Sequence, residues 1–140
     1  KDRWAALLVA TIYLWAPFRF QTILVSAAMG IAFVFVFLPL LLLGILRTAT
    51  SQKARSGIVL LGLSIAGIIL SHLMSFLVLI PFIFLFILWF FIKTKDINFL
   101  KRVGLGFILG VALASFYLLP ALYYSRLTQV SSGTFASLYL

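Results

Sequence analysis

The residue best suited to chemistry is His72, the single histidine of the chain. It lies near the middle of a long apolar stretch, 57–92, that contains no other ionisable group. Because ionisable groups inside such stretches are rare and costly, this imidazole is a candidate for binding a phosphate or moving a proton. A structural interpretation stays open, in which Ser71, His72 and Ser75 satisfy backbone groups at a break in the helix.

Two arginines, Arg19 and Arg126, are the other candidates for a phosphate site. A guanidinium group binds phosphate or pyrophosphate in bidentate fashion, and the topology derived below places both arginines on the same membrane face as His72. For Arg126 we favour an anchor that reaches the lipid headgroups. For Arg19, which follows Pro17 closely, the roles of anchor and ligand fit equally well.

Other chemistry is poorly represented in the chain. It has no cysteine, and its two acids, Asp2 and Asp96, are both expected in the cytoplasm, which leaves no carboxylate base for a site on the outer face. No phosphate-binding loop, dinucleotide-binding glycine motif or metal-spaced cluster occurs. We therefore expect no catalytic residue and no metal site in this segment, and the sequence indicates no cofactor.

The composition predicts the elements that must hold these residues. Apolar residues make up 65% of the chain and charged residues only 9%, whereas soluble domains have about 45–50% and 25%. The net charge of +9 comes from short basic clusters between apolar runs, a pattern typical of membrane topology signals and contact with anionic lipid. We expect an all-α polytopic helix bundle in the cell membrane, with the lipid bilayer and not nucleic acid as its partner.

Spanning a membrane takes about 20 helical residues. The apolar runs predict five passes, followed by an external tail at 121–140; the passes are 4–17, 22–46, 57–71, 74–92 and 103–120. The stretch 57–92 is too long for one pass, so we expect a tight hairpin at Ser71-His72. Pro17 is expected to end the first pass and Pro39 to kink the second.

The basic residues predict the orientation. The loops at 47–56 and 93–102 are both basic, and the positive-inside rule places both in the cytoplasm, so an even number of passes must separate them. Only Arg19 and Arg126 then lie outside; the inside residues are Lys1, Arg3, Arg47, Lys53, Arg55, Lys93, Lys95, Lys101 and Arg102. Since the first residue is Lys1, we expect an internal piece of a longer protein, whose remaining helices are its neighbours.

Small residues recur at helical spacing in the last predicted pass. Gly106, Gly110 and Ala114 are four residues apart, and Gly62 and Ala66 repeat that spacing. Small side chains let membrane helices approach closely. We interpret the stripe as a helix-packing surface, with a substrate groove as the alternative.

Two short motifs carry a family resemblance. Ser71-His72, followed by the tripeptide IPF at 80–82, and the run SFYLLPAL at 115–122 resemble stretches of large prokaryotic membrane proteins labelled pyruvoyl-tetrahydropterin synthase-related. The likeness covers about the second half of the chain. Such proteins look like GT-C membrane glycosyltransferases, so the resemblance implies a many-pass protein that takes sugars from polyprenyl-phosphate donors on the outer face. Family members often carry a Glu directly after the LPAL run, where this chain has Tyr123-Tyr124.

The resemblance and the outer cations together lead to a functional expectation. We expect part of a GT-C-like membrane protein that handles a lipid-linked sugar or its polymer, with Arg19 and His72 binding the donor phosphate. The catalytic acid of GT-C enzymes sits in an early external loop and would come from outside this segment. A transporter or flippase bundle is the alternative, because it uses similar kinked and glycine-striped helices, and a non-catalytic scaffold is a third. An inverted repeat in the full protein would favour the transporter.

Overall fold

The computed structural model describes residues 2–25, 28–50 and 53–125, and this part of the chain contains helices and no strand. The elements are α1 (Arg3–Leu14), α2 (Pro17–Phe20), the π-helical turn η1 (Gln21–Val25), α3 (Met29–Thr48), α4 (Ala54–Ser71), α5 (Leu73–Thr94) and α6 (Ile97–Ser125). Among the described residues, 5 helical stretches are long and apolar enough to cross a membrane. This confirms the predicted all-α bundle of five passes.

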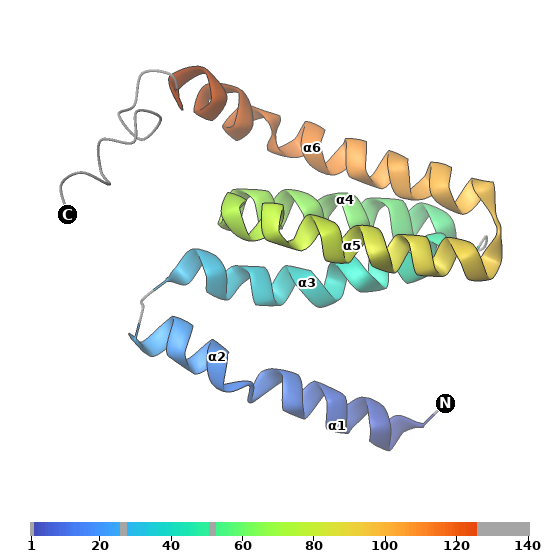
Figure 1. Ribbon diagram of the computed structural model, residues 1–140, viewed down its shortest axis with the longest axis horizontal. Helices are drawn as coiled ribbons and strands as arrows, with labels where there is room; N and C mark the ends of the chain where they lie inside the picture. Colours follow the sequence, from blue (N-terminus) through green and yellow to red (C-terminus); the bar gives the residue numbers. More distant parts are fainter. Residues whose placement is uncertain (1, 26–27, 51–52, 126–140) are drawn as a thin grey trace.

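The tight hairpin is also confirmed. α4 ends at Ser71 and α5 begins at Leu73, so His72 alone connects them, with an extended backbone (φ −162°, ψ 96°). α4 and α5 run in opposite directions, and the chain alternates in direction from α3 to α6 (Figure 1). The two basic loops predicted from the sequence, 47–56 and 93–102, therefore lie at the same end of the bundle.

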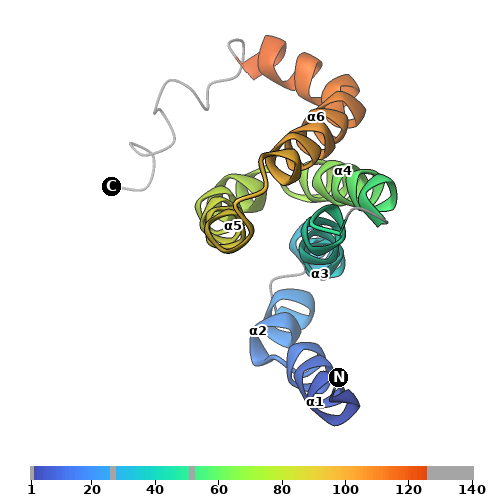
Figure 2. The same ribbon diagram turned by 90° about the vertical axis from the view of Figure 1, so that its right-hand side faces the viewer.

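The best-packed part of the bundle is the row formed by α3, α4 and α6, in which α4 lies between the other two (Figure 2). The core of this row is mostly aliphatic, with one fully buried aromatic ring; it includes Leu41, Ile45, Leu61, Ile65, Ile68, Ile69, Phe99, Val103 and Ala114. α5 lies beside the row and contacts it less, and α1 contains no buried residue. Open space remains between α3 and α5 and between α3 and α1.

The first pass differs from the predicted span 4–17. Asp2 caps α1 by accepting the Trp4 N–H at 3.1 Å, and α1 ends at Leu14. Pro17 then occupies the first turn of α2, and the spanning stretch continues to Leu24. The first helix thus breaks just ahead of Pro17, and the apolar stretch continues beyond it in α2. Proline is tolerated at a helix start because its φ is already helical and its missing N–H would have no partner there. The next pass correspondingly begins at Met29, not at residue 22.

The last pass is longer than the predicted 103–120. α6 has 29 residues and starts beside Asp96, whose Oδ1 accepts the Asn98 N–H at 2.8 Å. It continues past Pro120, because membrane helices tolerate proline where the freed groups find other partners. Residues 121–125 of the predicted tail are thus helical, and the remainder of that tail lies outside the described residues. Lys101 and Arg102 belong to α6 and not to a loop.

Candidate functional site

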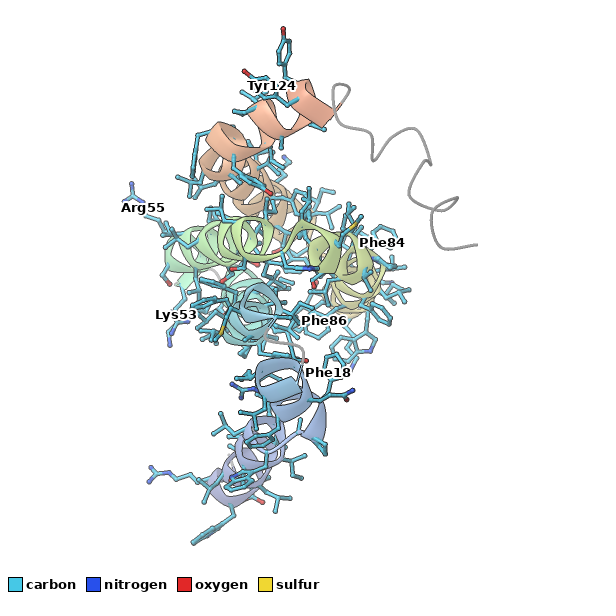
Figure 3. All side chains as sticks on the ribbon, turned by 90° about the vertical axis from the view of Figure 1, so that its left-hand side faces the viewer. Phe18, Lys53, Arg55, Phe84, Phe86 and Tyr124 are labelled. Atoms are coloured by element: carbon cyan, nitrogen blue, oxygen red, sulfur yellow. The ribbon has the colours of Figure 1, made fainter. Side chains whose placement is uncertain are left out.

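The two ends of the bundle differ in their polar residues. The hairpin end, as we call it, holds the α4–α5 turn with His72, α2 with Arg19, and the C-terminal part of α6 (Figure 1). The opposite, basic end holds the N-terminus of α4 and the C-terminus of α5, with Lys53, Arg55 and Lys93. Lys53 and Arg55 project away from the bundle (Figure 3). The two described phosphate candidates therefore share an end that is remote from these cations.

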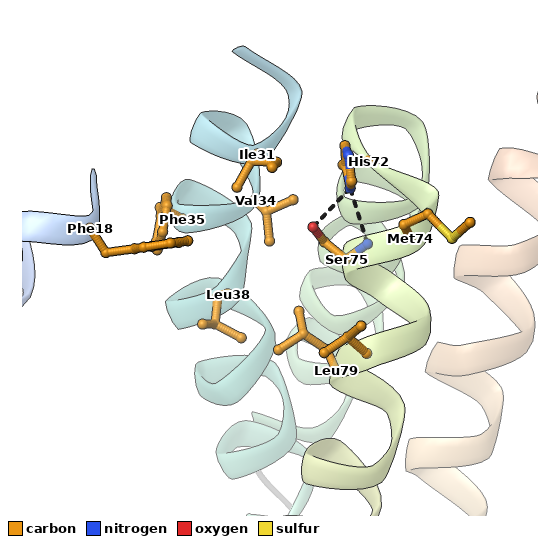
Figure 4. A pocket seen from close by; sticks show the side chains of 10 residues that line it. Phe18, Ile31, Val34, Phe35, Leu38, His72, Met74, Ser75 and Leu79 are labelled. Atoms are coloured by element: carbon orange, nitrogen blue, oxygen red, sulfur yellow. Dashed lines mark hydrogen bonds between the residues drawn. The ribbon is translucent and has the colours of Figure 1, made fainter. Parts of the chain in front are cut away.

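His72 acts as the N-cap of α5. Its Nδ1 accepts the backbone N–H of Ser75 at 3.1 Å and lies 2.9 Å from the Ser75 Oγ (Figure 4). A ring nitrogen that accepts a backbone N–H must keep its lone pair, so the geometry assigns a neutral imidazole with its hydrogen on Nε2. The Nε2–H is the group that His72 has left to offer a ligand.

An open cavity of about 310 Å³ separates α3 from α5 below this cap (Figure 4). Among the described residues that line it, His72 and Ser75 have polar side chains; the others are Phe18, Ile31, Val34, Phe35, Leu38, Met74, Val78 and Leu79. A cavity of this kind suits an apolar chain that ends in a hydrogen-bond acceptor. We call it the α3/α5 cavity.

A larger groove of about 890 Å³ lies between α3 and α1. Its walls are mostly small or aliphatic; they consist of Ala5, Ala6, Val9, Ala10, Tyr13, Leu14, Arg19, Phe35, Val36, Leu38, Pro39 and Leu42. The Arg19 guanidinium carbon lies 5.7 Å from the Tyr13 ring centroid and 5.6 Å from that of Phe35. These distances permit cation–π attraction to both rings. Among the described residues that line this α1/α3 groove, Arg19 alone is charged.

Arg19 and His72 do not line the same cavity. Arg19 belongs to the α1/α3 groove and His72 to the α3/α5 cavity, and Phe35 and Leu38 line both. The two side chains thus share an end of the bundle without facing one ligand position. Arg126 lies outside the described residues, and within the described part no three His, Cys, Asp or Glu side chains come together as a metal site requires.

Sequence reasoning missed Tyr13 and Phe35. The Tyr13 hydroxyl donates to the Phe35 carbonyl oxygen at 2.6 Å, and the rings meet edge to face with centroids 6.4 Å apart. One signal was present in the sequence: Pro39 stands four residues after Phe35 and cannot donate to its carbonyl. The spacing of residues does not show which side chain donates to the Phe35 carbonyl instead of the missing N–H.

The small-residue stripe of α6 faces α4. A Cβ added to Gly106 would lie 2.7 Å from Leu61 Cδ2, and one added to Gly110 would lie 2.7 Å from Ile65 Cβ. Ala114 is fully buried. These residues line a closely packed helix pair, and neither of the two cavities described above includes them.

The fold and the ends of the bundle define the class. Five apolar helical stretches of spanning length, with basic residues collected at one end, make this chain a polytopic α-helical membrane protein. Its solvent is the lipid bilayer. The chain belongs to the family described as 6-pyruvoyl-tetrahydropterin synthase related domain, a membrane protein family, which it matches over residues 1–138. No curated protein and no solved structure matches it.

Proposed function

We propose that this chain binds a lipid-linked phosphate at the outer face of a prokaryotic cell membrane, as part of a GT-C-like protein that handles polyprenyl-phosphate-linked sugars. The observation that carries the proposal is the α1/α3 groove, whose described lining is largely apolar and contains one charged residue, Arg19. The apolar walls suit a polyprenyl chain, and the guanidinium suits the phosphate that ends it.

The charge of Arg19 has no counterpart nearby in the described part of the chain. The only two acids of the sequence are Asp2 and Asp96. Asp2 caps the start of α1 and Asp96 caps the start of α6, both at the basic end. A guanidinium at cation–π distance from two aromatic rings can still bind an anion through its N–H groups. An anionic headgroup would supply the missing charge.

The headgroup must provide most of the affinity. A polyprenyl chain in the groove exchanges lipid contacts for protein contacts, and lipid tails are as apolar as the groove walls. Burying the chain therefore contributes little net driving force, whereas the contact between phosphate and guanidinium has no equivalent in the bilayer core. In this proposal Arg19 sets the affinity and the groove selects the shape of the chain.

His72 has a narrower role in this proposal than Arg19. With Nδ1 occupied by the cap, it offers one neutral donor, Nε2–H, at the α3/α5 cavity. It can contact an acceptor oxygen of a lipid headgroup but adds no positive charge while the cap is intact. The carboxylate that a glycosyl transfer needs would come from outside this segment.

A transporter or flippase bundle is the second candidate, and one observation favours it. The first pass is discontinuous: α1 ends at Leu14, α2 begins at Pro17, and a π-helical turn follows. Interrupted helices and π-helical turns are frequent at the binding sites of membrane transporters. Lipid translocation measured in vesicles containing the full-length protein, without sugar transfer, would support this candidate over the transferase.

Arg19→Gln tests the proposal directly. A charged hydrogen bond contributes roughly 1.5–3 kcal/mol, so the variant should bind polyprenyl phosphate about ten- to a hundredfold more weakly. The measurement is binding to the purified full-length protein, with the phosphate-free polyprenol as the matched ligand. Arg55→Gln, which removes an exposed cation at the basic end, should leave both affinities unchanged. If the Arg19→Gln variant binds polyprenyl phosphate as tightly as the parent, the proposal is contradicted.

A further inference from the structure

Pro39 leaves one carbonyl of α3 without its helical partner. In an α-helix the N–H of residue 39 would donate to the carbonyl of residue 35, and proline has no N–H. The Phe35 carbonyl is thus freed inside a membrane span, where no water replaces the lost donor. A donor from another helix can stabilise it.

Tyr13 supplies that donor. Its hydroxyl, on α1, donates to the Phe35 oxygen at 2.6 Å. Within the described residues the structure records no other hydrogen bond between α1 and α3. Because α1 contains no buried residue, this bond is a principal contact that holds the wall of the α1/α3 groove in place.

The same two residues hold the guanidinium of Arg19. The rings of Tyr13 and Phe35 are the two on which Arg19 lies, at 5.7 and 5.6 Å. The two rings meet edge to face, with centroids 6.4 Å apart and 68° between their planes, and the guanidinium carbon lies at nearly the same distance from both. A hydrogen bond that fixes Tyr13 on Phe35 also fixes where the Arg19 charge sits.

We infer that Tyr13 is a positioning residue for Arg19, and that Pro39 makes this possible by freeing the Phe35 carbonyl. The inference rests on the proposed function and deepens it, because it names two residues that determine affinity for the phosphate headgroup through Arg19. Tyr13 acts by aligning the guanidinium, and its hydroxyl is already used by the carbonyl.

Two single variants and their combination test the inference. Tyr13→Phe keeps the ring and removes the donor, whereas Pro39→Ala restores the helical N–H that competes for the Phe35 carbonyl. Each should weaken binding of polyprenyl phosphate about three- to tenfold and leave the affinity for polyprenol unchanged. The double variant should lose no more than either single one, because both changes remove the same bond. Pro39→Ala improves the helix, so it keeps the test valid if Tyr13→Phe does not fold.

The matched controls are Pro81→Ala and Tyr117→Phe. Pro81 also lies inside a spanning helix, and Tyr117 lies on α6, away from the groove. Both should bind polyprenyl phosphate like the parent.

The outcomes separate this inference from the proposed function. If Arg19→Gln weakens phosphate binding but Tyr13→Phe does not, the positioning role is overturned and the proposed function stands. If neither variant weakens it, both are overturned. Equal losses for polyprenyl phosphate and polyprenol would show that the hydroxyl only anchors α1, and additive losses in the double variant would show that Pro39 does not supply the acceptor.

Discussion

At the scale of single residues, His72 serves two helices at once. Its backbone N–H donates to the Ile68 carbonyl at 2.9 Å and closes α4, while its Nδ1 accepts the Ser75 N–H and starts α5. A doubly protonated ring would place a hydrogen against the Ser75 N–H, so the cap requires the neutral form. The geometry thus supports the structural interpretation of His72 and limits its ligand chemistry to Nε2–H.

Replacing this side chain should show its value as a cap. We expect His72→Ala to lower the free energy of unfolding by about 0.5–2 kcal/mol, the range found for lost N-caps. His72→Asn should retain most of the stability, because Asn is a favoured N-cap with an acceptor oxygen at similar reach. Thermal unfolding of the full-length protein in detergent measures the difference. Equal losses in the two variants would show that the side-chain cap contributes nothing.

At the scale of elements, α4 and α6 approach closely because each has glycine, which carries no side chain, at the contact. Leu61 and Ile65 of α4 pack against Gly106 and Gly110 of α6. Leu109 of α6 packs against Gly62 of α4. In lipid, where apolar burial gives no net advantage, such interlocking contacts supply much of the attraction between helices. This pair of helices is therefore sensitive to added volume.

Gly110→Leu should separate these two helices. Its side chain would overlap Ile65, and the carbonyl oxygen of Gly62 already lies 2.9 Å from the added Cβ. Gly104→Leu is the matched control on the same helix, because a Cβ there meets nothing within 4 Å. We expect a lower midpoint of thermal unfolding in detergent for Gly110→Leu and little change for Gly104→Leu. Similar midpoints for both would mean that the interface tolerates separation.

One cation of the basic end has a structural role between elements. Arg102 on α6 donates from Nη1 to the Thr48 carbonyl oxygen at 3.2 Å, at the C-terminus of α3. The last carbonyls of a helix lack intrahelical partners and carry partial negative charge, so a guanidinium stabilises them. The sequence pattern predicts Arg102 to be a loop residue that acts as a topology signal. The structure places it in α6, where it also makes this hydrogen bond to α3.

At the scale of the whole molecule, aromatic and basic residues are distributed between the two ends. Trp89 lies near the basic end with the Lys93 ammonium 4.2 Å from its ring centroid, whereas Tyr124 points away from the bundle near the hairpin end (Figure 3). Both types favour the interface between lipid and water. By the positive-inside rule we propose that the basic end faces the cytoplasm.

Cysteine labelling in intact cells tests this orientation. The variants are Tyr123→Cys at the hairpin end and Ser56→Cys and Thr94→Cys at the basic end, each in a full-length protein that has no other cysteine. All three positions are exposed. An impermeant thiol reagent should label only position 123, and all three should react once the cells are permeabilised. Labelling of 56 or 94 in intact cells would reverse the proposed topology.

The sequence by itself determined the class of protein, the number of passes and the hairpin. Each depends on local properties: the length of an apolar run against the thickness of the bilayer, and the placement of cations between runs. The stretch 57–92 had to break because it is too long for one pass, and His72 is the polar residue near its middle. The candidates Arg19 and His72 could be assigned to one membrane face by the same reasoning.

Only the tertiary structure decided how the helices are turned toward one another. Sequence position gives the depth of a residue along a helix axis, whereas its neighbours depend on packing between segments that are distant in the chain. Tyr13 meets Phe35 across 22 positions, and Arg19 and His72 line two different cavities beside α3 although they share an end. Pro17 is a similar case. A proline can follow the end of one helix or occupy the first turn of the next, and only the packing of the whole chain shows that here it starts α2.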